Sequence, residues 1–183
     1  MKRVLMCAGV LIAATFSLSA QQKPPASPAE TATGTIGGKT VTVSYNSPRV
    51  KGREGHVFTK DGLIQSAHGS QYPIWRAGAN AATTLKSDGN LMIGDLAVPA
   101  GTYTLFVDIT DPDHWTLIVS KKTGEWGLAY DPSQDLGRVK MKMGKPTAMV
   151  EDLLWTIDGD GGKGGKMTLA WEDRVASVSV ATH

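Results

Sequence analysis

The sequence predicts an all-β protein, an antiparallel β-sandwich or jelly-roll-like barrel in a single domain. Its apolar residues occur in short runs broken by glycine, and little recurs at helical spacing over three turns. Alternation of apolar and polar residues is clearest in residues 139–143 (VKMKM) and 166–171 (KMTLAW). Short strands joined by Gly, Pro and Asp turns, with no strand–helix–strand rhythm, are typical of sandwiches and barrels.

The chain begins with the pattern of a secretory signal peptide over residues 1–20. The pattern consists of a basic start at Lys2 and Arg3, an apolar run over 4–18, and small residues at Ser17, Ser19 and Ala20. Cleavage after Ser19 and cleavage after Ala20 both fit. The apolar run is too short to span a bilayer comfortably. We therefore expect a secreted or periplasmic protein that has no stable membrane insertion after cleavage.

Charge and cysteine content exclude several classes of function. Removal of residues 1–20 lowers the net charge from +2 to zero and removes Cys7, which is the single cysteine. The remaining chain has no disulfide framework, thiol nucleophile or cysteine metal site. A neutral chain also has no electrostatic footprint for nucleic acid, so we expect no nucleic-acid partner.

A tether and one domain follow the signal peptide. Residues 21–33 (QQKPPASPAETAT) are rich in Pro, Ala and polar residues and predict a flexible linker. The sandwich domain is expected over 34–183. Gly37-Gly38 and Gly94-Asp95 indicate hairpin turns. The expected strands cover 34–36, 39–45, 91–93, 96–98, 102–109, 114–120, 138–143, 150–157, 166–171 and 175–180.

The segment 73–84 (PIWRAGANAATT) sets a Trp-Arg pair beside residues without bulk. Taken alone, the pair favours Trp75 in the core and Arg76 on the other face, because adjacent strand residues face opposite sides. The small neighbours allow a second interpretation, in which Trp75 anchors the segment while Arg76 and Asn80 face a shallow site. A guanidinium there would bind a carboxylate or phosphate, or pair with a protein carboxylate, for which Asp135 is the first candidate.

No motif predicts a metal, a cofactor or a catalytic residue. His56 and His68 share a glycine-punctuated segment with Asp61, but their spacing matches no ligand motif. Residues 158–166 (DGDGGKGGK) resemble a calcium loop only in part, because Lys163 stands where the loop requires glycine. We therefore expect a turn between two strands there.

Six segments in this order resemble a known family: SPRVKGR from Ser47, WRAGANAAT from Trp75, VPAGTYTLF from Val98, WTLIVSK from Trp115, EWGLAYD from Glu125 and DLGRVKM from Asp135. They resemble the secreted bacterial domain-of-unknown-function family 2911 (DUF2911), over about 41–180. The resemblance implies that the family pattern includes Arg53, Trp75, Arg76, Gly78, Asn80, Thr83, Gly101, Tyr103, Trp115, Asp135 and Arg138. The resemblance implies that the protein is exported and that the fold covers this range. It implies no particular activity. The chain departs from the pattern at Ala81, where the family often has Glu.

The leading hypothesis is an exported module that binds a small anionic or carbohydrate ligand, or that acts as an accessory module. The candidate binding residues are Arg53, Trp75, Arg76, Asn80, Thr83, Asp135 and Arg138. One alternative is a hydrolase acting on envelope or carbohydrate material, with Glu172 or Asp135 as the acid and an arginine that stabilises charge. Another is a purely structural domain whose arginines form buried ion pairs.

Overall fold

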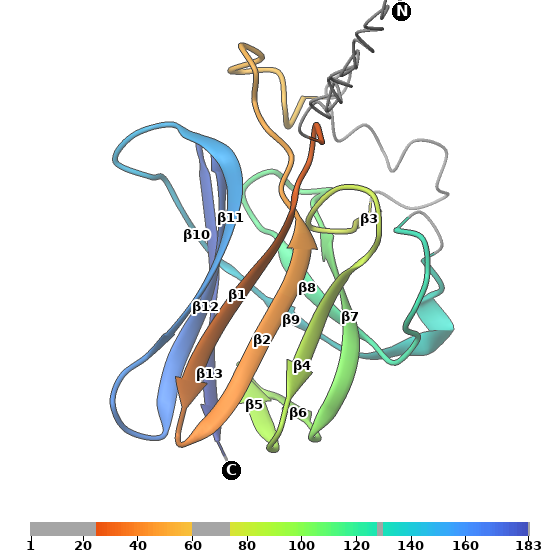
Figure 1. Cartoon of the computed structure of the whole chain (residues 1–183), viewed down its shortest axis with the longest axis vertical. Helices are drawn as coiled ribbons and strands as arrows, with labels where there is room; N and C mark the ends of the chain where they lie inside the picture. The colour runs from red at the N-terminus through yellow and green to blue at the C-terminus, as the bar shows by residue number, and fades with distance from the viewer. Residues whose placement is uncertain (1–24, 60–73, 128–129, 183) are drawn as a thin grey trace, which may run out of the picture.

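Two antiparallel sheets pack face to face in the computed structural model, which describes residues 25–59, 74–127 and 130–182 (Figure 1). The predicted all-β sandwich is confirmed. The expected signal peptide and its cleavage site lie outside the described residues. Within the described part, no helix is long and apolar enough to cross a bilayer.

The first sheet has seven strands and the second has six. In spatial order the first contains β1 (Ala29–Ile36), β2 (Lys39–Asn46), β4 (Thr83–Ser87), β7 (Gly101–Asp108), β8 (Thr116–Ser120) and β9 (Asp135–Lys140), with β3 (Ile74–Trp75) paired to β7. The second contains β11 (Val150–Gly159), β12 (Gly164–Glu172), β13 (Arg174–Thr182), β5 (Leu91–Ile93) and β6 (Leu96–Val98), with β10 (Lys142–Gly144) paired to β13. A 3-10 turn, Pro132–Gln134, precedes β9.

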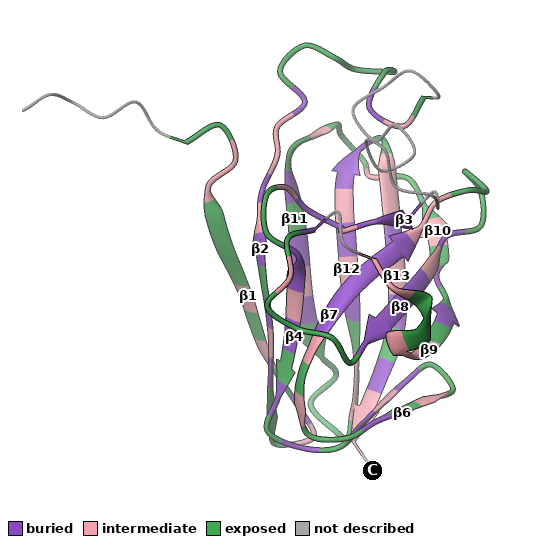
Figure 2. Cartoon of the chain, turned by 90° about the vertical axis from the view of Figure 1, so that its right-hand side faces the viewer, coloured by how far each residue is buried: buried purple, intermediate pink, exposed green. Residues whose placement is uncertain are grey.

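The core lies between the sheets and contains four of the five tryptophans, Trp75, Trp115, Trp155 and Trp171. The rings of Trp75 and Trp171 stack with their centroids 6.0 Å apart. Phe58 packs against Trp75, Trp115 and Trp171. Trp75 therefore anchors its segment in the core, as expected. Figure 2 shows buried residues concentrated in β7 and β8, whereas β1 is mostly exposed.

The hairpin turns form where the glycines predict them. Gly37 and Gly38 both have positive φ, at 54° and 76°, between β1 and β2. Gly94, at 58°, occupies the turn between β5 and β6. Two consecutive residues with positive φ match the right-handed twist of a hairpin. β1 begins at Ala29, so the strand includes residues 29–33 of the segment that was expected to be a flexible linker.

Two strands, β3 and β4, were missed and one was divided. β4 was not predicted because two of its three core-facing residues, Thr83 and Ser87, are polar although both are buried. The single strand expected over 138–143 is split at Met141, where the chain crosses from the first sheet to the second. The Met141 amide donates to the carbonyl of Trp115 at this crossing.

Candidate functional site

A loop interrupts the first sheet directly after Trp75. Trp75 lies opposite Val107 of β7. Thr83 lies opposite Leu105 of the same strand. β3 and β4 therefore run in line along one edge of β7, and residues 76–82 are looped out between them.

Side chains from the core hold the backbone of this loop. The carbonyl of Ala77 accepts hydrogen bonds from Trp155 Nε1 (3.1 Å) and from the Thr83 hydroxyl (3.2 Å). The indole of Trp75 donates to the carbonyl of Gly78 at 3.1 Å. Ala77 is fully buried and has φ of 52°, in the left-handed region that non-glycine residues seldom adopt. Three hydrogen bonds to two carbonyls fix this conformation.

The small residues of the loop serve close packing of the chain against itself. A Cβ placed on Gly78 would stand 2.8 Å from the Thr83 hydroxyl and 3.1 Å from the carbonyl oxygen of Asn46. The next amide, that of Ala79, donates to the same Asn46 carbonyl at 3.0 Å. The interpretation that the small residues leave room for a ligand is therefore wrong at Gly78, because β2 and Thr83 fill that space.

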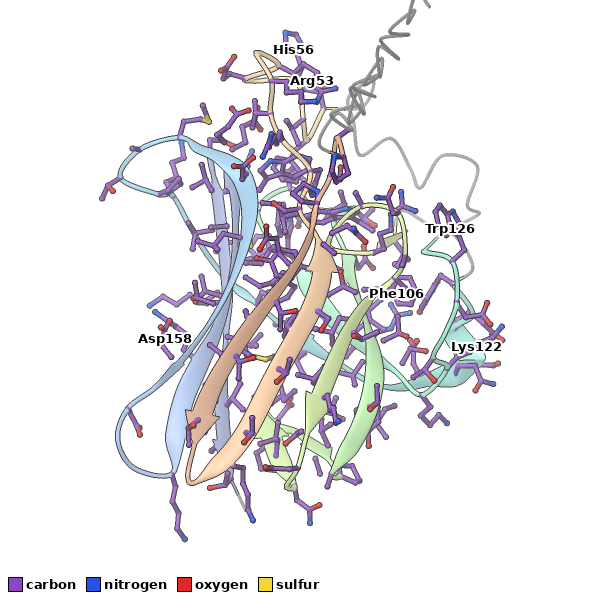
Figure 3. The ribbon with its side chains drawn as sticks, viewed as in Figure 1. Arg53, His56, Phe106, Lys122, Trp126 and Asp158 are labelled. Carbon is purple, nitrogen blue, oxygen red and sulfur yellow. The ribbon has the colours of Figure 1, made fainter. Side chains whose placement is uncertain are left out.

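The outer face of the first sheet, on the side away from the core, carries a second apolar cluster. Ile74, Phe106 and Ile118 are buried together and separate from the main core. The ring of Tyr130 covers them, with its centroid 5.1 Å from that of Phe106. Tyr130 belongs to the connection between β8 and β9, which also carries Trp126 (Figure 3). This connection therefore covers part of the outer face.

Tyr130 joins a charged network at one side of this cluster. Its hydroxyl donates to Asp135 Oδ2 at 2.8 Å and accepts from Arg138 Nη2 at 2.6 Å. Arg138 Nε donates to the same carboxylate oxygen at 2.9 Å, and its Nη1 lies 3.8 Å from Asp108. Burial and the neighbouring Asp135 raise the pKa of Tyr130 well above its usual range. The phenol therefore stays protonated at neutral pH.

The expected ion pair of Arg76 with Asp135 is not formed. Asp135 binds Arg138, which lies three residues along on the same strand and reaches the carboxylate on the same face. The pairing of β9 with β8 explains this arrangement. Asp135 lies opposite Ser120 and Arg138 lies opposite Ile118. Ser120 and Ile118 are two residues apart, so they lie on the same face of β8. Both side chains thus point out from the same face of β9.

The guanidinium of Arg76 has no partner for its charge in the part of the chain that the structure describes. Among the described residues, Arg76 Nη1 is buried and has no hydrogen-bond partner, and no carboxylate lies within ion-pair distance of the guanidinium. The aliphatic part of the side chain packs on Gly127, where any Cβ would overlap with Arg76 Cδ. Burial lowers the pKa of the guanidinium, which still keeps its charge at neutral pH.

Two further buried atoms on this face have no partner within the described ranges. They are the hydroxyl of Thr104, which is 1% exposed, and Oδ1 of Asp135. Thr104 lies opposite Ser120, and Ser120 lies opposite Asp135, so the three residues form one row across β7, β8 and β9. The outer face therefore offers a cation, a hydroxyl and a carboxylate oxygen.

The family described as "Protein of unknown function (DUF2911)" matches residues 27–180 of this chain. The chain belongs to that family. No curated protein and no solved structure matches it.

The three arginines that the resemblance selected, Arg53, Arg76 and Arg138, do not share one site. Arg53 folds back on its own loop, where its Nε donates to the carbonyl of Val50 and its Nη2 to that of Arg49, both at 2.8 Å. Figure 3 shows it at one end of the molecule, away from Phe106 on the outer face. Arg76 and Arg138 both belong to the β3–β7–β8–β9 side of the first sheet. Arg53 is thus a loop-closing residue.

The other predicted site residues divide between the core and the surface. Trp75 and Thr83 are buried and hydrogen-bond to the loop, as described above. Asn80 is exposed, with φ of 57°. Sequence reasoning did not select Trp126 or Tyr130, although both lie in the EWGLAYD segment that it quoted. The sequence signal that could have identified Trp126 and Tyr130 is two aromatic residues inside the otherwise polar connection between β8 and β9.

The two acids of the hydrolase alternative do not face each other. Asp135 projects from the outer face of the first sheet, whereas Glu172 ends β12 in the second sheet. Glu172 is 3% exposed and accepts a hydrogen bond from the amide of Gly55. Of these two alternative acids, Asp135 lies beside an arginine, with Arg138 Nε 2.9 Å from its carboxylate.

The described residues contain no group of three or more metal-ligating side chains close enough to hold an ion. His68 and Asp61 lie outside the described ranges. In the glycine-rich stretch that partly resembles a calcium loop, Asp160 Oδ1 accepts from the amides of Gly162 and Gly164. That carboxylate therefore closes a turn between β11 and β12.

Proposed function

We propose that this DUF2911 chain is an exported binding protein that holds a small anionic ligand, a carboxylate or a phosphate, at Arg76. The export part of the proposal rests on the signal-peptide pattern of residues 1–20. The binding part rests on one observation: the guanidinium of Arg76 is half-buried and has neither a hydrogen bond at Nη1 nor a counter-charge among the described residues.

The other described arginines supply the comparison, because Arg53 donates to two backbone carbonyls and the remaining three have carboxylate partners. Arg138 has Asp135 and Asp108, Arg49 has Asp152 at 2.7 Å, and Arg174 has Asp113 and Asp173. Burying the guanidinium of an arginine away from water without a partner destabilises the folded protein by roughly several kcal/mol. An oxyanion that binds the guanidinium in a bidentate manner offsets that cost and adds charge-assisted hydrogen bonds.

The loop and the β8–β9 connection keep Arg76 in one place. The loop carbonyls are held by Trp75, Thr83 and Trp155, and Gly127 packs on the arginine side chain. A guanidinium that is fixed before the ligand arrives loses less conformational entropy on binding. Pre-organisation of this kind supports a binding role over a purely structural one.

The test is a thermal-shift series with acetate, citrate, inorganic phosphate and sulfate on the purified protein and two variants. Arg76→Ala removes the proposed anchor. Arg49→Ala is the matched control, because Arg49 is a paired arginine on the surface. We expect at least one anion to raise the midpoint of the wild type and of Arg49→Ala through linkage, and to leave folded Arg76→Ala unmoved. Equal shifts in Arg76→Ala, or no shift in any protein, would contradict the proposal.

A further inference from the structure

Trp126 is the one exposed tryptophan of the five, all of which lie in described residues. Its exposed fraction is 59%, whereas those of the other four are 5% or less. A tryptophan carries one of the largest apolar surfaces of any side chain, and leaving that surface in water is unfavourable. The position of the exposed indole therefore bears directly on what the protein binds.

The backbone of Trp126 is held against the loop that carries Arg76. Trp126 forms an isolated β-bridge with Ala81, and the amide of Ala82 donates to the carbonyl of Glu125 at 3.4 Å. The next residue, Gly127, packs on Arg76. Figure 3 shows the Trp126 side chain standing out from the side of the molecule. The exposed indole and a guanidinium that has no partner among the described residues thus belong to one small region of the surface.

The polar surroundings of Trp126 favour a small ligand over a protein partner. Asn80 is exposed beside it in the loop, and Lys122 and Glu125 form an ion pair at 3.4 Å. Among the described residues, the other exposed large hydrophobic side chains are those of Met149 and Leu154, which lie next to and in β11 of the other sheet. A protein interface requires an extended patch with an apolar centre, and the described residues around Trp126 do not form one.

A pyranose ring fits a surface of this kind. Its C–H bonds give one apolar face that packs on an aromatic ring, while its hydroxyls point outward to polar groups. A ring that also carries a carboxylate would place one charge next to the stacked face. Building on the proposed anion site, we infer that the ligand is a sugar acid in its ring form, a uronate, with its ring on Trp126, its carboxylate on Arg76 and its hydroxyls within reach of Asn80.

The affinities of two acids of equal charge distinguish ring stacking from simple anion binding. Glucuronate presents a pyranose ring, and gluconate presents the same number of carbons and one carboxylate on an open chain. Titration calorimetry with both acids is run on the wild type, Trp126→Ala, Arg76→Ala and the control Met149→Ala. Trp126 is exposed, so Trp126→Ala should fold as stably as the wild type.

We expect glucuronate to bind the wild type and Met149→Ala about tenfold more tightly than gluconate, since stacking on an aromatic side chain has about that worth. Trp126→Ala should bind the two acids equally, and Arg76→Ala should bind neither. Glucuronate should also protect wild-type fluorescence from acrylamide, because the other four tryptophans are already buried.

The inference and the proposed function fail in different ways. Equal affinity of the wild type for glucuronate and gluconate, with binding of both dependent on Arg76, would overturn the sugar-acid inference and leave the anion site standing. Absence of binding by both acids and by acetate and phosphate would overturn both.

Discussion

Arg76 packs its aliphatic side chain on the bare backbone of Gly127, and any Cβ at position 127 would overlap with Arg76 Cδ. This contact joins the loop between β3 and β4 to the connection between β8 and β9. It fixes the one arginine that has no partner among the described residues. Gly127 therefore helps to set the position of the Arg76 guanidinium.

Gly127→Ala should displace Arg76 and weaken anion binding without touching the guanidinium itself. Crowding at a packed site costs about 1–3 kcal/mol of unfolding free energy, which urea unfolding measures. Gly144→Ala is the matched control, because no atom lies within 4 Å of a Cβ built there and its φ is not positive. A Gly127→Ala protein that binds anions as the wild type does would show that Arg76 need not lie where this contact holds it.

Tyr130→Phe should remove the hydroxyl that links Asp135 and Arg138. The loss leaves a partly buried carboxylate and guanidinium with one hydrogen bond fewer each, which costs about 1–3 kcal/mol. Urea unfolding at pH 7 measures this change, with Tyr103→Phe as the comparison, since the hydroxyl of Tyr103 donates to a backbone carbonyl at an exposed position. Equal stability of Tyr130→Phe and the wild type would contradict a stabilising role for the network.

The same hydroxyl predicts a dependence on alkaline pH. The folded protein raises the pKa of Tyr130 above the value of about 10 for an unfolded chain. Its contribution to stability is therefore complete below pH 10 and is lost as the pH rises toward the folded pKa. The stability difference between the wild type and Tyr130→Phe should shrink above about pH 10. A difference that stays constant up to pH 11.5 would rule out this linkage.

Ser47→Ala should weaken the contact between the two sheets that joins the segment after β2 to β11. The Ser47 hydroxyl is buried and donates to the carbonyl of Leu153 at 2.7 Å, beside a backbone hydrogen bond from Leu153 to Pro48. Leaving that carbonyl with one bond fewer should cost about 1–2 kcal/mol. The exposed Ser133→Ala, measured in the same unfolding series, should change stability by less. A smaller effect at Ser47 than at Ser133 would contradict this role.

Glu172→Ala should free the loop around Gly55 from the end of β12. The carboxylate accepts from the Gly55 amide, and Phe58 of the same loop packs against Trp75, Trp115 and Trp171. We expect faster hydrogen exchange at Gly55 and a weaker near-ultraviolet dichroism signal from the tryptophans. Glu172→Gln, which keeps an acceptor oxygen, should change both signals less. Equal exchange in the two variants would argue against the carboxylate as the tether.

Sequence patterns predicted the fold wherever glycine turns and apolar alternation coincide. β5 and β6 have the predicted bounds, and β2 differs by one residue. β4 was not predicted because Thr83 is polar yet buried. Its hydroxyl donates to the carbonyl of Ala77, and apolar patterning does not reveal a tertiary contact of this kind. The split at Met141 likewise depends on which sheet each half of the segment joins.

The candidate site was predicted in part. Arg76 was selected because it stands among small residues, but the reason for those residues was misread, since Gly78 packs against Thr83 and Asn46. Asp135 was assigned to the wrong arginine because strand register, which places Arg138 beside it, does not follow from composition.

The most direct test of the account is the affinity of phosphate and acetate for Arg76→Lys beside the wild type, measured by titration calorimetry at two salt concentrations. Lysine keeps the charge and loses the planar fork that binds an oxyanion through two hydrogen bonds. The account predicts anion binding by the wild type that weakens about tenfold or more in Arg76→Lys and is absent from Arg76→Ala. Identical affinities in all three proteins would contradict it, because Arg76 would then take no part in binding.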